Sequence, residues 1–335
     1  MAQISAVQPS KVSRVQISKG LLTVLVSTGM LFLLSALLAP SSVVPGTLLG
    51  MLPFAAILGI VGLGQMLVIQ QAGIDLSVPG AVSLAIVIVS HEPNGDNSKL
   101  FGAVVMALGF AVVAGLLNAL LIGVMSLNPI IATLGTNALL FGAVLGISGG
   151  TPRTTTTLLA AIAGGISFGI PNAVFFVLAT LLVVVIVLRK TVAGRRYEAI
   201  GASAPVARVS GLHVKTHQGL AYVWAQLLYC TAGIVLAGVT NQPTAFQGNA
   251  YMLPSVAVVV LGGTSLLGGR GLPAATVLAA LFLTQLDQFV LALGVPYAVR
   301  TLVQAAALAI GVAIYTVDWP RLRASLKGLL SVEKP

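Results

Sequence analysis

The sequence contains very little charge and a single cysteine. Only 7% of its 335 residues are charged, and seven of those are acidic. A soluble domain carries about a quarter charged residues to keep its surface in water. This composition therefore excludes a soluble globular chain. The lone Cys230 also excludes an intrachain disulfide and a cysteine metal cluster.

Motifs of catalysis and nucleotide binding are missing as well. The sequence has no H-E-x-x-H pair and no G-x-x-x-x-G-K-[ST] phosphate loop. His213 and His217 lie four residues apart, but no third metal ligand accompanies them in their basic segment. We therefore expect no enzyme, no catalytic residue, no metal and no cofactor bound by this chain.

What the sequence has in abundance is long apolar runs. Hydrophobic residues make up 57% of the chain, and the mean hydropathy is +1.05. Runs of about 20 apolar residues are long enough to cross a bilayer as helices. The prediction is an all-α fold, a polytopic transmembrane helical bundle forming one domain over residues 1–335. Ten spans are expected, at residues 20–39, 48–70, 76–90, 100–125, 129–148, 171–190, 217–239, 254–267, 272–290 and 298–317.

The net charge of +10 comes from three basic clusters. They lie in the N-terminal tail (1–19), in the central loop (190–216) and in the C-terminal tail (318–335). Short loops rich in Lys and Arg stay on the cytoplasmic side of a membrane. Both termini and the central loop are thus expected to be cytoplasmic, and the charge indicates topology, with no nucleic acid as a partner.

Two stretches interrupt the apolar pattern in similar ways. One lies around residues 73–80 and the other around residues 262–271, each between two apolar runs. Interrupted segments at corresponding places in two halves of a chain are a sequence indicator of a transport pathway. The predicted structural breaks are Gly73, Pro79, Gly262, Gly263, Gly268 and Gly269.

The central loop is too polar to span a membrane, yet apolar residues recur in it at roughly helical spacing. They include Tyr197, Ile200, Val206 and Val209. One interpretation is a short cytoplasmic helix whose apolar face lies in a groove of another protein. The other is a solvated basic connector held inside by its charge. The pattern alone leaves both open.

Four ordered motifs resemble one family of membrane proteins. The central loop reads GRRYEAIG at residues 194–201 and ARVSG at residues 207–211. Residues 72–78 read AGIDLSV, residues 128–135 read NPIIATLG, and residues 258–269 read VVVLGGTSLLGG. Together they are similar to the motifs of ribose-type, carbohydrate ABC importer permeases, the inner-membrane translocation subunits.

The resemblance implies a mechanism and a set of partners. Two permease chains, identical or paralogous, would form one pathway in the bacterial inner membrane and its lipid. A cytoplasmic ABC ATPase subunit would bind ATP and magnesium, and an extracytoplasmic binding protein would deliver the solute. A helix over Glu198–Gly211 would fit a cleft of the ATPase. The coupling residues implied are Arg195, Arg196, Tyr197, Glu198, Ala199, Ile200, Gly201, Arg208 and Gly211.

An uncharged sugar would be held by neutral polar groups and aromatic faces. The candidate pathway residues are Gln65, Gln70, Asp75, Asn118, Thr133, Asn137, Phe246 and Gln304. For the polar ones the alternative is an ordinary interhelical hydrogen bond, and for Phe246 it is packing. Asp75 and Ser77 also suit the capping of the helix that follows them.

Two other classes of transporter stay open. An ion-gradient-driven secondary transporter needs a buried ionisable constellation, for which Asp75 and Asp287 are the only plausible members. An ABC permease for branched-chain amino acids or nucleosides would share the same architecture. The central-loop motif argues against the first, and the sparse charge within the spans favours a sugar over an amino acid.

Overall fold

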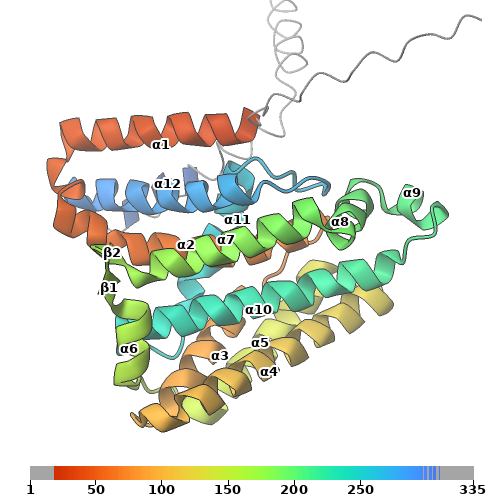
Figure 1. Cartoon of the computed structure of the whole chain (residues 1–335), viewed down its shortest axis with the longest axis horizontal. Helices are drawn as coiled ribbons and strands as arrows, with labels where there is room; N and C mark the ends of the chain where they lie inside the picture. The colour runs from red at the N-terminus through yellow and green to blue at the C-terminus, as the bar shows by residue number, and fades with distance from the viewer. Residues whose placement is uncertain (1–18, 297, 300–301, 304, 307–308, 310–335) are drawn as a thin grey trace, which may run out of the picture.

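The computed structural model describes residues 19–296, together with 298–299, 302–303, 305–306 and 309. Its helices run mostly side by side along the long axis of the molecule (Figure 1). Seven of them are long and apolar enough to cross a membrane. The chain is therefore an all-α polytopic membrane protein, as its apolar runs predict.

The elements follow one another with short connections. In chain order they are α1 (Lys19–Leu38), η1 (Pro40–Ser42), α2 (Pro45–Gln70), α3 (Val78–His91), η2 (Asn97–Lys99), α4 (Leu100–Asn118), the π-helix η3 (Ala119–Val124), α5 (Pro129–Ser148), α6 (Thr157–Gly164), β1 (Ile166–Ser167), β2 (Ile170–Pro171), α7 (Asn172–Lys190), α8 (Val192–Ala202), α9 (Ala204–Val209), α10 (Val214–Thr240), η4 (Gln247–Tyr251), α11 (Met252–Leu261) and α12 (Pro273–Ala292). The strands β1 and β2 pair antiparallel as a hairpin.

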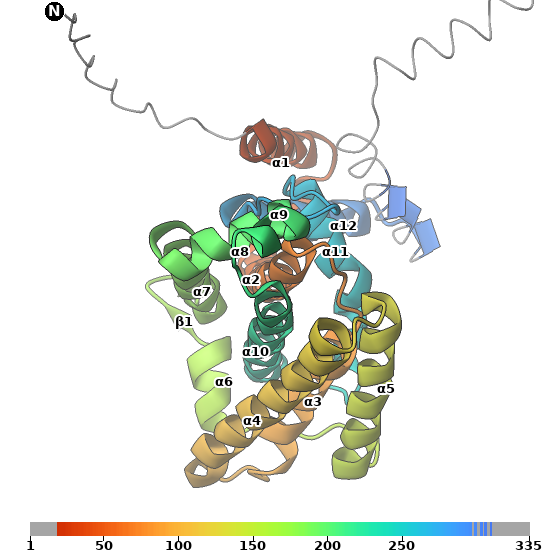
Figure 2. The same ribbon diagram turned by 90° about the vertical axis from the view of Figure 1, so that its right-hand side faces the viewer.

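Helices α2 and α10 form the centre of the bundle (Figure 2). In its most apolar stretch, 83% of α2 is buried inside the protein, against 22% for α1 and for α7. A helix that is hydrophobic all round and buried all round is a core element. The outer helices α1, α4, α5 and α7 instead expose leucine, isoleucine, valine and phenylalanine side chains, such as Leu37, Phe101 and Leu182, which suits contact with lipid.

Two predicted spans are shorter than a full crossing helix. The predicted span 76–90 is the 14-residue helix α3, and the predicted span 254–267 ends earlier, at Leu261. Gly262 and Gly263 follow, and Gly263 has a φ of +81° that L side chains rarely adopt. The backbone therefore leaves the helix there. The predicted span 298–317 lies largely outside the described residues.

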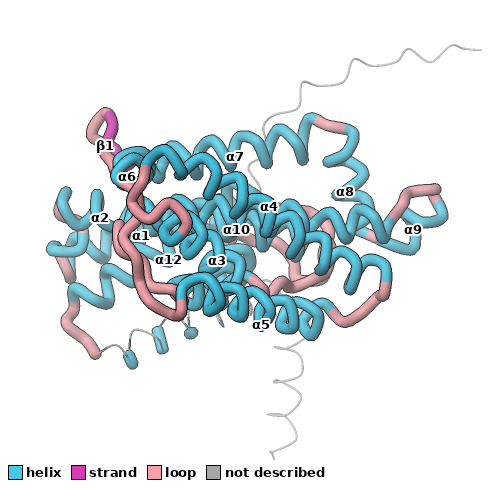
Figure 3. The backbone as a smooth tube through the Cα atoms, turned by 90° about the horizontal axis from the view of Figure 1, so that it is seen from below, coloured by secondary structure: helices cyan, strands magenta, loops and turns pink. Residues whose placement is uncertain are grey.

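The two ends of the bundle differ in character. One end carries α6 and the β1–β2 hairpin, and the opposite end carries α8 and α9 (Figure 3). We call them the hairpin end and the α8–α9 end. The predicted spans leave residues 149–170, at this hairpin end, without a predicted element. The helix α6 forms there because the Thr156 side chain caps its first turn, accepting a hydrogen bond from the Leu159 N–H.

Candidate functional site

The central loop folds into two short helices where the sequence suggested one helix over Glu198–Gly211. Thr191 caps α8 by accepting a hydrogen bond from the Gly194 N–H at 3.0 Å. The chain becomes extended at Ser203 and starts α9 with a proline in its first turn. Gly211, with a φ of +81°, then redirects the chain into α10. Both helices lie at one end of the bundle (Figure 1).

Tyr197 fastens α8 to the last turns of α2. Its side chain is buried, and its hydroxyl donates a hydrogen bond to the Leu67 carbonyl. The Tyr197 carbonyl in turn accepts a hydrogen bond from Nε2 of Gln71 at 2.9 Å. The helix is thus tied to α2 by both its side chain and its backbone.

Gly201 brings the backbone of α8 into direct contact with α2. A Cβ added at Gly201 would lie 2.1 Å from the Gln70 carbonyl oxygen. The same carbonyl accepts a hydrogen bond from the Gly269 N–H at 3.0 Å. Gly268 adopts a φ of +90°, which keeps the loop close to Gly201. We call the meeting of residues 197–201, 67–72 and 268–271 the coupling junction.

A shared ion pair closes the coupling junction on one side. Oε1 of Glu198 lies 4.0 Å from Nη1 of Arg189 and 3.8 Å from Nε of Arg270. Arg189 also donates a hydrogen bond to the Gly271 carbonyl at 3.3 Å. These side chains are a third or more exposed, so the pairs contribute little to stability. They place Glu198 of α8 beside the loop between α11 and α12.

Among the remaining predicted coupling residues, Ile200 faces inward and the others are exposed. Ile200 is buried and packs with Ala207 and Val214, which holds α9 on α8 and α10. On α9, Val206 is 64% exposed and Val209 is 91% exposed, with the exposed Arg208 between them. This surface of Val206, Arg208 and Val209 is the α9 face. Also exposed are Arg195, Arg196, Ala199 and Gly211.

A buried polar cluster lies between α2 and α10, beside the break that separates α2 from α3. The Asp75 carboxylate accepts hydrogen bonds from the N–H and the hydroxyl of Ser77, and from Nε2 of Gln226. Gln226 also donates to the Ser77 hydroxyl at 2.6 Å. Asp75 is the only charged side chain among the buried groups of the described residues. Ser77, not Asp75, is the residue before α3.

The cluster extends to two further helices, α4 and α5. Nδ2 of Asn118 donates to the Ser77 hydroxyl at 3.3 Å, and the Thr136 hydroxyl donates to Oδ1 of Asn118 at 2.6 Å. The Gln65 amide oxygen accepts a hydrogen bond from the Asp75 N–H at 3.2 Å, and its nitrogen donates to the Asp75 carbonyl at 3.1 Å. The same nitrogen lies 2.8 Å from the Tyr229 hydroxyl. Three of the predicted pathway residues, Gln65, Asp75 and Asn118, therefore belong to one network.

Two more predicted pathway residues contact the backbone at, or just before, the start of α3. The Thr133 hydroxyl accepts a hydrogen bond from the Leu76 N–H at 2.9 Å, and Oδ1 of Asn137 accepts one from the Gly80 N–H at 2.8 Å. N–H groups at a helix start have no partner within the helix. The helix α5 thus supplies acceptors to the backbone at the start of α3. Pro79 lies in the first turn of α3, where its missing N–H is not needed.

The other predicted pathway residues lie apart from the cluster. Gln70 is buried at the coupling junction, where Gly271 leaves room for its side chain. Phe246 is partly exposed and packs edge-to-face on Phe141, with ring centroids 5.4 Å apart. Gln304 lies outside the described residues.

Sequence reasoning missed three members of the cluster, Thr136, Gln226 and Tyr229. A signal for two of them was present. Tyr222, Gln226 and Tyr229 recur at helical spacing within an apolar span, so they share one face. The Tyr222 hydroxyl also lies beside the break, because a Cβ added at Gly73 would sit 2.4 Å from it. The polar face that these three residues form on α10 therefore predicts that α10 packs against the break at Gly73.

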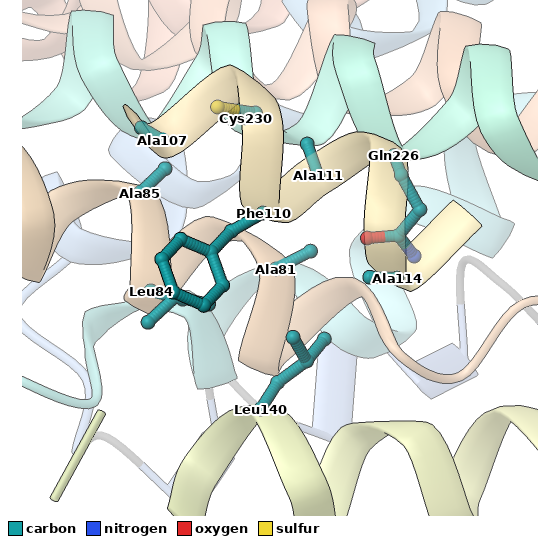
Figure 4. Close-up of a pocket in the computed structure, with 10 residues that line it drawn as sticks. All are labelled: Ala81, Leu84, Ala85, Ala107, Phe110, Ala111, Ala114, Leu140, Gln226 and Cys230. Atoms are coloured by element: carbon teal, nitrogen blue, oxygen red, sulfur yellow. The ribbon is translucent and has the colours of Figure 1, made fainter. Parts of the chain in front are cut away.

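Gln226 also borders a narrow crevice between α3, α4, α5 and α10. Figure 4 shows its amide pointing toward the space between Ala81, Ala114 and Leu140. The crevice has a volume of about 10 Å³, which is about the room one water molecule needs. Gln226 Oε1 has no hydrogen-bond partner among the described residues. This space is far too small for a solute.

The fold and these sites define a class: a polytopic helical membrane protein with a broken helix at a buried polar cluster and helices that project beyond the bundle. The sequence profile of the family described as "Branched-chain amino acid transport system / permease component" matches residues 47–312. The chain belongs to this family of transport permeases, whose members are multi-pass inner-membrane proteins.

Several curated proteins are similar over most of their length. A probable ABC transporter permease protein of Sinorhizobium fredii is 34% identical, covering 70% of this chain and 71% of its own. The ribose import permease of Bacillus subtilis is 33% identical, covering 79% of this chain and 83% of its own. The autoinducer 2 import system permease protein LsrD of Photorhabdus luminescens is 30% identical, covering 76% of this chain and 78% of its own. No solved structure matches the chain.

Proposed function

We propose that this chain is the permease subunit of a binding-protein-dependent ABC importer that carries a sugar or sugar-like solute. Family membership and relatives named for ribose import and autoinducer 2 import support this function. The observation that carries it is the arrangement of the central loop. Tyr197 and Gly201 bind α8 inward, while α9 presents Val206 and Val209 outward. With α8 held against α2 and α9 exposed, a protein that binds α9 could move the end of α2.

The topology that we propose has ten crossings with both termini in the cytoplasm. Basic residues gather at the α8–α9 end, including Arg196, Arg208 and Lys215, and positive loops stay inside. The start of α1 lies at this end too, because Gly20 is close to Gly262 and Leu272. Seven long helices, α3 and the η4–α11 segment account for nine crossings, and the predicted span 298–317 would be the tenth.

The proposed coupling route runs through the end of α2. An ATPase subunit that moves α9 would move α8, and through Tyr197 it would move residues 67–71. These residues lead directly into the break that holds Asp75. A two-state rearrangement of the break would then alter the polar cluster, and ATP binding by the partner would bias its equilibrium. Arg195, Arg196 and Ala199 would lie at the edge of the contact.

The proposed pathway lies between two permease chains. In the described part of one chain, the crevice at Gln226 is too small for a sugar and the groove beside α7 is lined mostly by apolar side chains. A second permease, identical or paralogous, would complete the pathway, and a binding protein would deliver solute at the hairpin end. Neutral amides and hydroxyls dominate the buried polar groups, which suits a sugar better than a charged solute.

The α9 face supplies the test of this function. The chain is purified in mild detergent from its native membrane, and the proteins that accompany it are identified. We expect an ABC ATPase to accompany the native chain. Replacing Val209→Asp or Arg208→Ala should reduce the recovered ATPase about tenfold or more, because contacts central to an interface cost roughly 2 kcal/mol when removed.

The matched control is Arg153→Ala, an exposed arginine at the hairpin end. It should leave ATPase recovery at the native level. Purification of the native chain without any ATPase would contradict the proposal, and so would equal ATPase recovery with the native chain and with Val209→Asp.

A further inference from the structure

A large apolar groove lies on the side of the bundle where α7 faces the membrane. Its volume is about 340 Å³, within the size range of small-molecule pockets. The helices α7 and α10 form its walls, and α8 closes the α8–α9 end. Aliphatic side chains such as Val184, Leu220 and Leu228 make up most of the lining. The coupling and transport steps proposed above make no use of this groove.

The shape of the groove fits one acyl chain. Along α10 it extends from His217 to Thr231, which is about 21 Å of helix at 1.5 Å per residue. Half of a hydrocarbon core of about 30 Å is roughly 15 Å, so a chain from one leaflet fits along it. Trp224 lines the groove and is 57% exposed. It lies about 10 Å along α10 from His217, where its ring can contact an acyl chain.

The mouth of the groove is basic. Ala193, Gly194 and His217 line this end, and the exposed Arg196 lies one turn along α8 from Ala193. The exposed Lys190 likewise follows the lining residue Val187 by three positions on α7. No ion pair to Lys190 or Arg196 occurs within the described residues.

Among the described residues, the acid nearest to these two side chains in the sequence is already paired with other arginines. Glu198 is the only acidic residue between positions 97 and 286, and it is already placed between Arg189 and Arg270. An apolar groove between spanning helices with an unpaired basic mouth is suited to one membrane component, a lipid with a negative headgroup.

We infer that this groove binds an anionic phospholipid of the leaflet at the α8–α9 end. One acyl chain lies along α10 against Trp224, and the phosphate group contacts Lys190, Arg196 and His217. The groove also includes Leu67 and Tyr197, the two residues joined by the hydrogen bond that anchors α8. A bound lipid therefore packs against the coupling junction. The position of α8 then depends on whether an anionic lipid occupies the groove.

Fluorescence of Trp224 tests this site directly. The chain has two tryptophans, so Trp319→Phe leaves Trp224 as the only reporter. The full chain is placed in phosphatidylcholine nanodiscs containing increasing amounts of phosphatidylglycerol brominated on its acyl chains, which quenches nearby tryptophan. We expect half-quenching at a lower mole fraction of brominated phosphatidylglycerol than of brominated phosphatidylcholine. Lys190→Gln and Arg196→Gln should each shift the phosphatidylglycerol midpoint upward about fivefold.

A pair of matched variants separates the groove from the general lipid boundary. Ala193 and Ala202 are both exposed alanines on α8, but only Ala193 lines the groove. Ala193→Phe should abolish the preference for phosphatidylglycerol, whereas Ala202→Phe should retain it. Equal quenching by the two brominated lipids would overturn the inference. Protection of Trp224 from both lipids, as a second protein chain in the groove would cause, would overturn it as well.

Discussion

Replacing Gly201→Ala is expected to reduce ATP-driven transport by roughly tenfold to a hundredfold. The added methyl group would lie 2.1 Å from the Gln70 carbonyl oxygen, so α8 must move away from α2. Overpacking of this kind costs about 1–3 kcal/mol, and each 1.4 kcal/mol changes a population about tenfold. The shift would disturb the Tyr197 and Gly269 contacts made at the same place.

The measurement is solute uptake into proteoliposomes that contain the purified complex. Gly135→Ala is the control, because it makes the same change within α5 at a position with open space around it. It should transport at the native rate. Recovery of bound ATPase with Gly201→Ala should stay near native, because Gly201 faces α2 and the α9 face is intact. Native uptake by Gly201→Ala would show that the coupling junction does not transmit movement.

The second large effect is expected at Asp75. Asp75→Ala removes the acceptor for the Ser77 N–H, the Ser77 hydroxyl and the Gln226 amide. A buried donor left without a partner costs about 1–3 kcal/mol. We therefore expect the thermal unfolding midpoint of the purified chain to fall by roughly 5 °C or more, together with most of the transport activity.

Asp75→Asn is the informative companion. It keeps an oxygen that can accept the Ser77 hydrogen bonds but removes the ionisable group. Under the proposed ATP-driven mechanism, Asp75→Asn should retain a substantial part of transport. Its unfolding midpoint should lie closer to that of the native chain than to that of Asp75→Ala. A secondary transporter that couples to an ion at Asp75 would instead lose all transport with Asp75→Asn, despite normal stability.

The helices of this fold were largely accessible from the sequence. Apolar runs marked the long helices, and glycine pairs marked where α11 ends. Such features are local, because a bilayer requires length and hydrophobicity of each span separately. Helix α6 and the hairpin were missed, since eight residues and two short strands leave no periodic signal above the apolar background.

The sites were only partly predictable, because their contacts join segments far apart in the chain. The motif at residues 194–201 indicated a coupling role for Tyr197 and Gly201. It could not show that both residues face inward onto α2. Tyr197 and its partner Leu67, for example, are 130 residues apart in the sequence. Likewise, Asp75 and Asn118 were chosen for their polarity within apolar spans. Their link through Ser77 depends on how α2, α4 and α10 pack.

The central claim is that ATP hydrolysis by a partner subunit moves solute through this chain. The most direct measurement reconstitutes the native complex in proteoliposomes with its binding protein and follows uptake of a labelled sugar that this binding protein binds. Ionophores collapse all ion gradients, and ATP is supplied only on the side of the α8–α9 end. We predict that uptake requires ATP and persists with the gradients collapsed. Uptake that needs an ion gradient and ignores ATP would contradict the account.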